Sequence, residues 1–429
     1  MALVSLPMSY VAFPITAAPL GVLPSVAIIT LVSLVMCIST AAIAEAIVLL
    51  PSDSRPKNLH DLVVIYLGKW AGSITALAIS VIFFVVLVAC NISIVETLYD
   101  LTGISKFVLL SLIVIVTLII ISFGSIAHSL SLVAGAIAIV LMLAIIAALI
   151  PFVDIDRVLY HQLPFTDHRG LAPNIWSGFL GVMILSFIGP LLLVPSATYV
   201  LPRNPEANLF IKGSLWGIIF QALLMALWVV AVDLTLLPGQ LIGLHGTVLI
   251  ELGQVTNPLI KITGVILVLI LPGLAAIRSA AQLGVQINLL FEKKAQAQDK
   301  NISLFNRYIL PAIPTVGAWL LVAALIDVNK EDVSIFLSVG GILGSTIATG
   351  IVPMVLYKAV IQRNTQPMIP LLFLFRHRLA IMFNFIFFII ILLLYGLFIW
   401  DSLIFQILAC LIAVMGIAQL FKLFPSNSK

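Results

Sequence analysis

Arg278 is the ionisable side chain that lies deepest within an apolar stretch of this sequence. It follows Lys261 by 17 residues and precedes Glu292 by 14. A helix would place it roughly 20 to 25 Å from either end, too far for its side chain to reach water. Gln282 and Gln286 follow at i+4 and i+8 and share its helix face. A buried guanidinium can hold a substrate carboxylate or take the electrostatic place of a bound cation. The alternative is a structural ion pair or a clamp on carbonyl groups between helices.

A second group of candidates comes from a broken apolar run at residues 182–202. Gly189-Pro190 interrupts this run, and Pro195 interrupts it again. Because proline removes a backbone donor and clashes with the preceding turn, carbonyl groups around Ile188 to Leu192 are predicted to lack their usual helical partners. In a membrane such groups must meet protein, water or ligand, and interrupted helices form substrate sites in many secondary transporters. The alternative is a proline kink that only shapes packing.

Polar residues inside other apolar runs are further candidates. Glu45 lies about one and a half turns before Pro51, where it could carry a proton; pairing with Arg55 or Lys57 is the alternative. Asn91 could face a central cavity from the third apolar run.

Glu96, Asp100 and Asp233 stand at the ends of apolar runs, where a charge costs little, so interface roles are expected for them. The tenth run carries a face of small residues. They are Ser338, Gly340, Gly341, Gly344, Ser345 and Thr346. Such faces more often allow close helix packing than ligand contact.

Signatures of several functional classes are absent from the sequence. It has no phosphate-binding glycine loop, no HExxH motif, no recognisable nucleophile–base pair and no cofactor motif, so an enzyme is not expected. His161 and His168 accompany aspartates without regular ligand spacing, which favours a solvated loop over a metal site. The net charge of +4 is spread over short loops, so a nucleic-acid partner is not expected.

The elements that must position the candidate residues are membrane-spanning helices. Of the 429 residues, 62% are hydrophobic and 9% are charged, and the mean hydropathy is +1.26, which no soluble domain approaches. An all-α polytopic membrane protein with one integral domain is therefore predicted. Runs of spanning length predict about twelve helices. They lie near residues 1–18, 23–50, 70–98, 107–123, 126–152, 175–201, 210–236, 258–290, 308–326, 333–357, 379–400 and 403–424.

The loops between these spans are asymmetric in charge. Fifteen of the 21 lysines and arginines fall on the side of the loop after the second span, and five fall on the other side. By the positive-inside rule the richer side is cytoplasmic, as is the C-terminus. One miscounted helix in the middle of the chain would scramble this asymmetry, so it supports the span count. Within the loop after the second span, residues 59–70 are predicted to form an amphipathic helix on the inner face.

Several short motifs, taken in order, give the chain a resemblance to a known family. They are Leu6-Pro7, Met36-Cys37 followed by Glu45 and residues 51–53, then residues 66–68 and 100–105, and Ser186-Phe187 with residues 194–196 and Tyr199. In this order and spacing they resemble the bacterial aromatic amino acid permeases. These are the tyrosine and tryptophan transporters of the amino acid/polyamine/organocation superfamily.

The resemblance implies two inverted five-helix repeats plus two trailing helices, which divides the chain into residues 1–152, 175–357 and 379–424. It also implies proton-coupled uptake of a hydrophobic or aromatic amino acid in the cytoplasmic (inner) membrane, by alternating access. The implied partners are the amino acid, protons and membrane lipid. The expected substrate contacts are Ser5, Asn91, Ser186, Phe187, Ile188, Gly189, Pro190, Leu191, Arg278 and Gln282, with Glu45 and Arg278 as candidates for proton coupling.

The chain departs from the family's pattern in two places. The family's glycine-rich break in the first helix would fall just before Leu6-Pro7, whereas the sequence begins at Met1, so the break and the inner half-helix are expected to be missing. The segment around Gly189-Pro190 is more apolar than the family's break, and Arg278 has no counterpart that can be placed. A changed substrate, or a degraded transporter, would explain both departures. A second hypothesis is a non-transporting membrane receptor or assembly subunit derived from the same fold.

Overall fold

The computed structural model of the chain is built from helices, with one small antiparallel strand pair. It describes residues 13–51, 55–122, 125–159, 166–167, 170–171, 173–203, 206–241, 248–295, 310–327, 338–363, 375, 377–400 and 402–423. The strands are Thr166–Asp167 (β1) and Gly170–Leu171 (β2).

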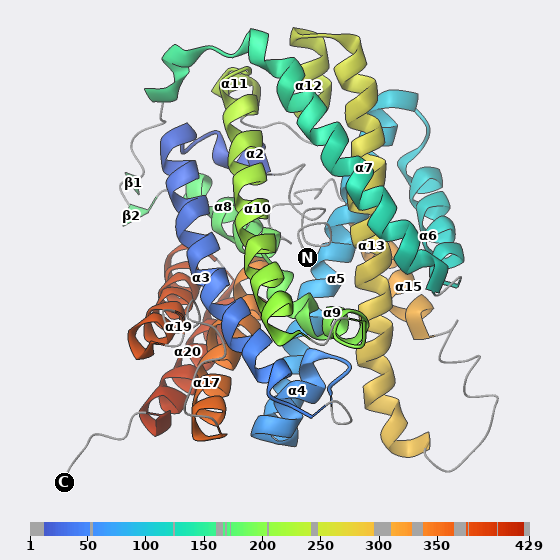
Figure 1. The fold of residues 1–429 in the computed structure, drawn as a ribbon. Coiled ribbons are helices and arrows are strands. Elements are labelled where there is room, and N and C mark those ends of the chain that lie inside the picture. The colour runs from blue at the N-terminus through green and yellow to red at the C-terminus, as the bar shows by residue number, and fades with distance from the viewer. Residues whose placement is uncertain are drawn as a thin grey trace.

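The helices follow one another along the whole chain, and Figure 1 shows their arrangement. The first half contains α2 (Phe13–Ala17), α3 (Val22–Val48), α4 (Leu59–Leu67), α5 (Lys69–Thr102), α6 (Lys106–Ser122), α7 (Ser125–Leu149), and the 3-10 turns η3 (Ile150–Phe152) and η4 (Ile155–Leu159). The centre contains α8 (Pro173–Ser186), the 3-10 turn η5 (Gly189–Leu192), α9 (Leu193–Val200), α10 (Ala207–Asp233), α11 (Pro238–Leu241), α12 (Val248–Val255) and α13 (Pro258–Ala295). The last part contains α15 (Leu310–Asp327), the π-helical segments η7 (Gly340–Gly344) and η8 (Thr346–Ile351), α17 (Val352–Arg363), α19 (Arg378–Leu394), the π-helical η9 (Tyr395–Ile399) and α20 (Leu403–Leu423).

These helices match the expected membrane spans. In the described part of the chain, nine helices are long and apolar enough to cross a membrane, and two shorter apolar helices lie at Lys106–Ser122 and Ala312–Leu325. In chain order they occupy the positions of the second to twelfth expected spans. The prediction of an all-α polytopic membrane fold is therefore confirmed. Of the first expected span, only α2 lies within the described residues.

Burial separates the central spans from the peripheral ones. Within the sixth span, Phe179–Val200, 83% of the spanning window is buried, whereas in the twelfth, Leu403–Leu420, only 22% is. The exposed side chains of peripheral helices, such as Leu112 and Leu411, are large and apolar, as expected where hydrocarbon rather than water faces the protein. The sixth span therefore lies in the interior of the bundle.

Close helix packing fixes the tenth span against its neighbours. Its first part, η7, packs between α5 and α8. A Cβ atom at Gly341 would overlap the carbonyl oxygen of Gly181, and one at Gly344 would overlap the Ile82 side chain. The backbones can approach this closely only because these positions are glycine. The packing interpretation of the small-residue face is thus confirmed.

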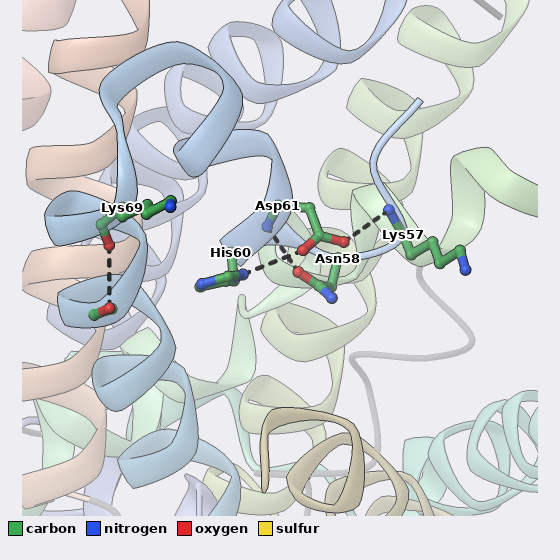
Figure 2. A network of polar contacts seen from close by, with 6 residues as sticks. Lys57, Asn58, His60, Asp61 and Lys69 are labelled. Carbon is green, nitrogen blue, oxygen red and sulfur yellow. Dashed lines mark hydrogen bonds and ion pairs between the residues drawn. The ribbon is translucent and has the colours of Figure 1, made fainter. Parts of the chain in front are cut away.

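The helix expected after the second span is α4, and polar contacts fix its start. The Asn58 side chain accepts from the N–H of Asp61 at 2.8 Å, and the Asp61 carboxylate accepts from the N–H of Lys57 at 3.3 Å (Figure 2). An asparagine N-cap satisfies a donor that the first turn leaves unpaired. The predicted end at residue 70 is wrong. The helix stops at Leu67, because Gly68, with φ of 89°, turns the chain into α5.

Two short helices, α11 and α12, lie between α10 and α13. Helix α12 buries Val248, Leu249 and Leu252 and packs against α13. Apolar residues on one face of even a short helix favour this docking. His161 and His168, considered above for a metal site, lie outside the described residues.

Candidate functional site

The sixth span is interrupted where the sequence predicts it. The 3-10 turn η5 separates α8 from α9. The carbonyl groups of the break are nevertheless bonded. That of Ile188 accepts from the N–H of Leu191 at 2.9 Å, and that of Pro190 accepts from the N–H of Leu193. Tightening to i+3 hydrogen bonds supplies these groups with donors after the i+4 ladder is lost. The interruption is therefore found, but free carbonyl groups at Ile188 and Pro190 are not.

A third carbonyl at the break is capped from another helix. The amide of Gln221 on α10 donates to the carbonyl oxygen of Ser186, and the Gln221 side chain is fully buried. The Ser186 hydroxyl donates to the carbonyl of Val182 at 2.8 Å. Both groups of Ser186 thus already have protein partners. Gln221 is not among the sequence-predicted contacts, and the available signal was a single amide in the apolar seventh span.

The other predicted contacts at the break are apolar and buried. Phe187 and Ile188 have no exposed surface, and Leu191 keeps only 4%. Nearby, Phe13 of α2 stacks on Phe179 of α8 with ring centroids 5.5 Å apart. All five side chains belong to one continuous hydrophobic cluster. At the break these side chains therefore form a closely packed apolar wall.

Arg278 lies on α13, which continues as one helix past Pro272. Unlike the carbonyl groups at the break, its side chain has polar atoms without hydrogen-bond partners among the described residues. Both terminal guanidinium nitrogens are buried and have no hydrogen-bond partner among the described residues. Gln282, one turn further along, is half-buried. The buried neighbours of Arg278, Ala275 and Ala280, belong to the same hydrophobic cluster as Phe187. A buried charge without a partner is costly. The arrangement therefore fits a site at which an anionic group meets this guanidinium.

Other buried polar atoms without hydrogen-bond partners in the described chain lie on the helices around α13. They include Ser279 Oγ and Gln286 Oε1 on α13 and both amide atoms of Asn91 on α5. The hydroxyls of Ser338 and Ser345 in the tenth span are in the same state. Helix α5 packs against both α13 and η7. Since buried polar groups are normally hydrogen-bonded, this concentration of exceptions marks a candidate ligand site.

A second buried polar cluster joins three spans and was missed by the sequence analysis. The Ser39 hydroxyl on α3 lies 2.6 Å from the carbonyl oxygen of Thr349 in η8 and 3.0 Å from Oδ1 of Asn384 on α19. The Asn384 Nδ2 donates to the same carbonyl at 3.1 Å. All three residues have no exposed surface. A π-helical turn shifts the backbone ladder, which helps one carbonyl accept from two side chains. A single asparagine within an otherwise apolar run was the available signal.

Glu45 and Glu96 occupy different kinds of position. Glu45, at the cytoplasmic end expected for α3, is 4% exposed and lines a cavity of about 10 Å³ with Tyr357 and Phe375. That volume is close to the minimum for one water molecule. Glu96 forms an ion pair with Lys106 at 2.7 Å between α5 and α6. The contact ties the end of α5 to the start of α6, and an interface role for Glu96 stays a prediction.

Asp233 differs from the interface position expected for it. It keeps only 7% exposure, and both carboxylate oxygens have no hydrogen-bond partner among the described residues. The turn η4 contacts this end of α10. Arg157 in that turn donates to the carbonyl of Thr235 at 2.9 Å and pairs with Asp154 at 3.0 Å. The helix end is therefore covered by protein rather than open to the interface.

Metal ligands do not converge in the described part of the chain. No group of three or more histidine, cysteine, aspartate or glutamate residues there could hold a metal ion. The predicted contact Ser5 lies outside the described residues. The structure thus places the apolar contacts at the break, and Asn91 and Arg278 among buried polar groups on α5 and α13.

Comparisons with known proteins relate the chain to others through its structure. No protein-family model and no curated protein matches the sequence. The crystal structure of a manganese transporter from Eremococcus coleocola, in complex with an aromatic bis-isothiourea substituted compound, matches with a TM-score of 0.61. The identity is 14%, and the match covers 99% of this chain and 92% of that chain. Two structures of mutants of the same transporter match with TM-scores of 0.61 and 0.60 at 12% and 13% identity, over the same shares of both chains. At this identity the likeness establishes the fold, and the chain has the polytopic helical fold of a membrane transporter.

Proposed function

We propose that this chain is a secondary active transporter that takes up a hydrophobic or aromatic amino acid by proton-coupled symport. It works in the cytoplasmic membrane by alternating access, with residues 1–152 and 175–357 as inverted repeats and residues 379–424 as accessory helices. The fold shared with a membrane transporter supports this class of mechanism. The charge asymmetry of the loops supports a cytoplasmic C-terminus.

The observation that carries the proposal is the unpaired guanidinium of Arg278. Its two terminal nitrogens are buried and have no hydrogen-bond partner among the described residues. A carboxylate is the ligand group that best matches the paired donors of a guanidinium. The amide of Asn91 on the adjoining helix α5 also has no hydrogen-bond partner in the part of the chain that the structure describes, and it could bind the polar end of the same ligand.

The apolar wall at the break supports the choice of side chain. Phe187, Ile188 and Leu191 are apolar and buried; once alternating access opens the site, they would give a ligand hydrocarbon and aromatic surface but no charge. Ligand sites commonly combine such a wall with a few polar groups that fix orientation. An amino acid with a hydrophobic or aromatic side chain has both parts in one molecule.

A divalent cation is the alternative substrate, because the similar solved structures are of a manganese transporter. Hard cations require several oxygen ligands, with carboxylates foremost. The side chains of Phe187, Ile188 and Leu191 provide none, and a guanidinium at Arg278 would repel the ion. We therefore favour the amino acid.

Glu45 is the proposed proton carrier. It is buried beside a water-sized cavity with Tyr357, close to the end of α3 that the charge asymmetry places at the cytoplasm. A carboxyl group in such a place can take up a proton in one conformation and release it in the other. Arg278 would complement this role as a fixed positive charge at the substrate.

Uptake into proteoliposomes tests the proposal directly. The purified chain should accumulate labelled phenylalanine, tyrosine, tryptophan or leucine under an imposed inward proton gradient, and a protonophore should abolish the accumulation. Failure with all twenty common amino acids would sink the transport proposal. Saturable binding without flux would instead support the receptor hypothesis. Uptake of labelled manganese with no amino acid uptake would overturn the assignment of substrate.

A further inference from the structure

We propose that the groove between α4, α5, the tenth span and α20 binds one acyl chain of an anionic phospholipid, with the headgroup beside Lys69. The groove is a cavity of about 440 Å³, within the range of about 300 to 1,000 Å³ that is usual for ligand pockets. It lies at the end of the bundle where α4, α17 and α20 meet (Figure 1). This inference is independent of which substrate the chain carries.

The lining of the groove selects a hydrocarbon occupant. Its walls include Val63 and Leu67 from α4, Ala71 from α5, Val355 from α17 and Met415 from α20. One of its few polar lining residues, Thr75, donates its hydroxyl to the carbonyl of Ala71 at 2.8 Å, so that donor is already used. A wet cavity needs polar partners for its water molecules. This cavity is instead suited to a flexible apolar chain.

The open side of the groove faces the membrane. Met415 and Ile74 at its edge are 45% and 38% exposed. Along α20 the exposed residues, such as Leu408 and Leu411, are apolar, as on a lipid-facing surface. Lipid is therefore the medium in contact with the opening, and an acyl chain can enter without crossing water.

The level of the headgroup is marked by Lys69 and Trp70. These residues lie between Leu67 and Ala71, which both line the groove. Trp70 is 85% exposed, and tryptophan side chains in membrane proteins concentrate at the membrane–water interface. The groove thus begins at the interface and extends toward the hydrocarbon.

Charge complementarity at this level favours an anionic headgroup. The Lys69 side chain is exposed, and its ammonium group takes part in no ion pair that the described residues make. The nearby carboxylate of Asp61 is held by the N–H of Lys57 and by His60 (Figure 2). Juxtamembrane lysines attract anionic lipids of the cytoplasmic leaflet. On the proposed orientation this is the leaflet that the groove faces.

Lipid binding to the full chain, measured by native mass spectrometry in detergent, tests the inference. Phosphatidylglycerol should be retained at lower concentration than phosphatidylcholine of the same chain length. Ala71→Phe and Val355→Phe, which fill the groove from opposite walls, should each weaken retention at least tenfold. Lys69→Gln should weaken phosphatidylglycerol binding about fivefold, as expected for one lysine at the surface, and should leave phosphatidylcholine binding unchanged.

Matched controls separate this site from general lipid adsorption. Lys57→Gln removes another exposed lysine, and no residue within four positions of it lines the groove. Leu112→Phe enlarges a lipid-facing residue on α6. Both should bind lipid like the wild type. Equal losses in Lys57→Gln and Lys69→Gln, or unchanged retention in the groove-filling variants, would overturn the inference.

The chain length of the lipid gives a readout that does not depend on any variant. The wild type should retain phosphatidylglycerol with sixteen-carbon chains far better than the same headgroup with six-carbon chains, by roughly fourfold for each buried methylene. Equal retention of the two lipids would show that no acyl chain is buried, and the inference would fail even if both groove-filling variants failed to fold.

Discussion

The interrupted sixth span and the continuous eighth span differ in whether their polar groups have hydrogen-bond partners. At the interruption, the carbonyls of Ile188 and Pro190 have backbone donors and that of Ser186 is capped by Gln221. In the eighth span, which continues as one helix past Pro272, the Arg278 guanidinium nitrogens lack partners in the described chain. A broken helix therefore does not by itself identify unsatisfied groups.

The difference shows that an interruption in the backbone does not predict where side chains lack hydrogen-bond partners. A break of a few residues can close its own hydrogen bonds by tightening to a 3-10 turn, and a neighbouring span can supply one more donor. A charged side chain within an apolar helix has no such local remedy. Among the described residues, buried polar atoms without partners therefore occur on α5, α10, α13 and the tenth span, whereas the side chains at the break are apolar and closely packed.

The largest effect is expected from removing the charge in the eighth span. Arg278→Gln should lower uptake by about two orders of magnitude, because losing one partner of a buried charge pair with the substrate costs about 2 to 5 kcal/mol. The melting temperature of the substrate-free protein should stay the same or rise, since an uncompensated buried charge is removed. Uptake assays and thermal unfolding of the purified protein measure the two effects.

Arg278→Lys is the matched control for that change. It keeps the positive charge but loses the planar pair of donors, so intermediate uptake is expected. A drop in melting temperature of Arg278→Gln, together with normal transport, would assign Arg278 a structural role and erase the contrast between the two spans.

A smaller effect is expected at the break, and it should appear in stability. Gln221→Leu leaves the buried carbonyl of Ser186 without its side-chain donor, which costs about 1 to 3 kcal/mol. Gln282→Leu on α13 is the control, because Gln282 is half-buried and makes no hydrogen bond with the described residues. Unfolding in mixed micelles should separate the two variants. Equal stability of both would show that the cap at the break contributes nothing.

The smallest effect is expected where three spans meet outside the proposed site. Ser39→Ala should destabilise the protein by about 0.6 kcal/mol and by no more than about 1.7 kcal/mol, the average and the maximum of double-mutant cycles on hydrogen bonds between membrane helices. A double-mutant cycle with Asn384→Ala should give a coupling energy of similar size. Ser80→Ala, which removes a hydroxyl bonded only within its own helix, serves as the control. Zero coupling in the cycle would mean that this cluster does not tie α3 to α19.

The sequence predicted the fold well because long apolar runs are a strong signal for membrane-spanning helices. Runs of apolar residues of spanning length must form helices, since no other structure satisfies the backbone in hydrocarbon. The second to twelfth expected spans accordingly appear as helices. The break at Gly189-Pro190 and the depth of Arg278 also follow from single residues and their spacing. Proline has no N–H, and a charge 14 residues from the nearest one on its helix cannot reach water.

Partners between helices could not be predicted from the sequence. Gln221 and Ser186 are 35 residues apart, and Ser39 and Asn384 are 345 apart. Each pair meets only because particular helix faces pack together. The sequence alone determined that a polytopic membrane bundle would form, with an interrupted helix and a deep arginine. Only the tertiary structure decided that the carbonyl groups of Ser186, Ile188 and Pro190 at the break find donors, whereas the terminal nitrogens of Arg278 find no acceptor among the described residues. The physical reason is that a polar group finds its partner only where two helix faces meet. Apolar runs of similar composition do not specify which faces meet.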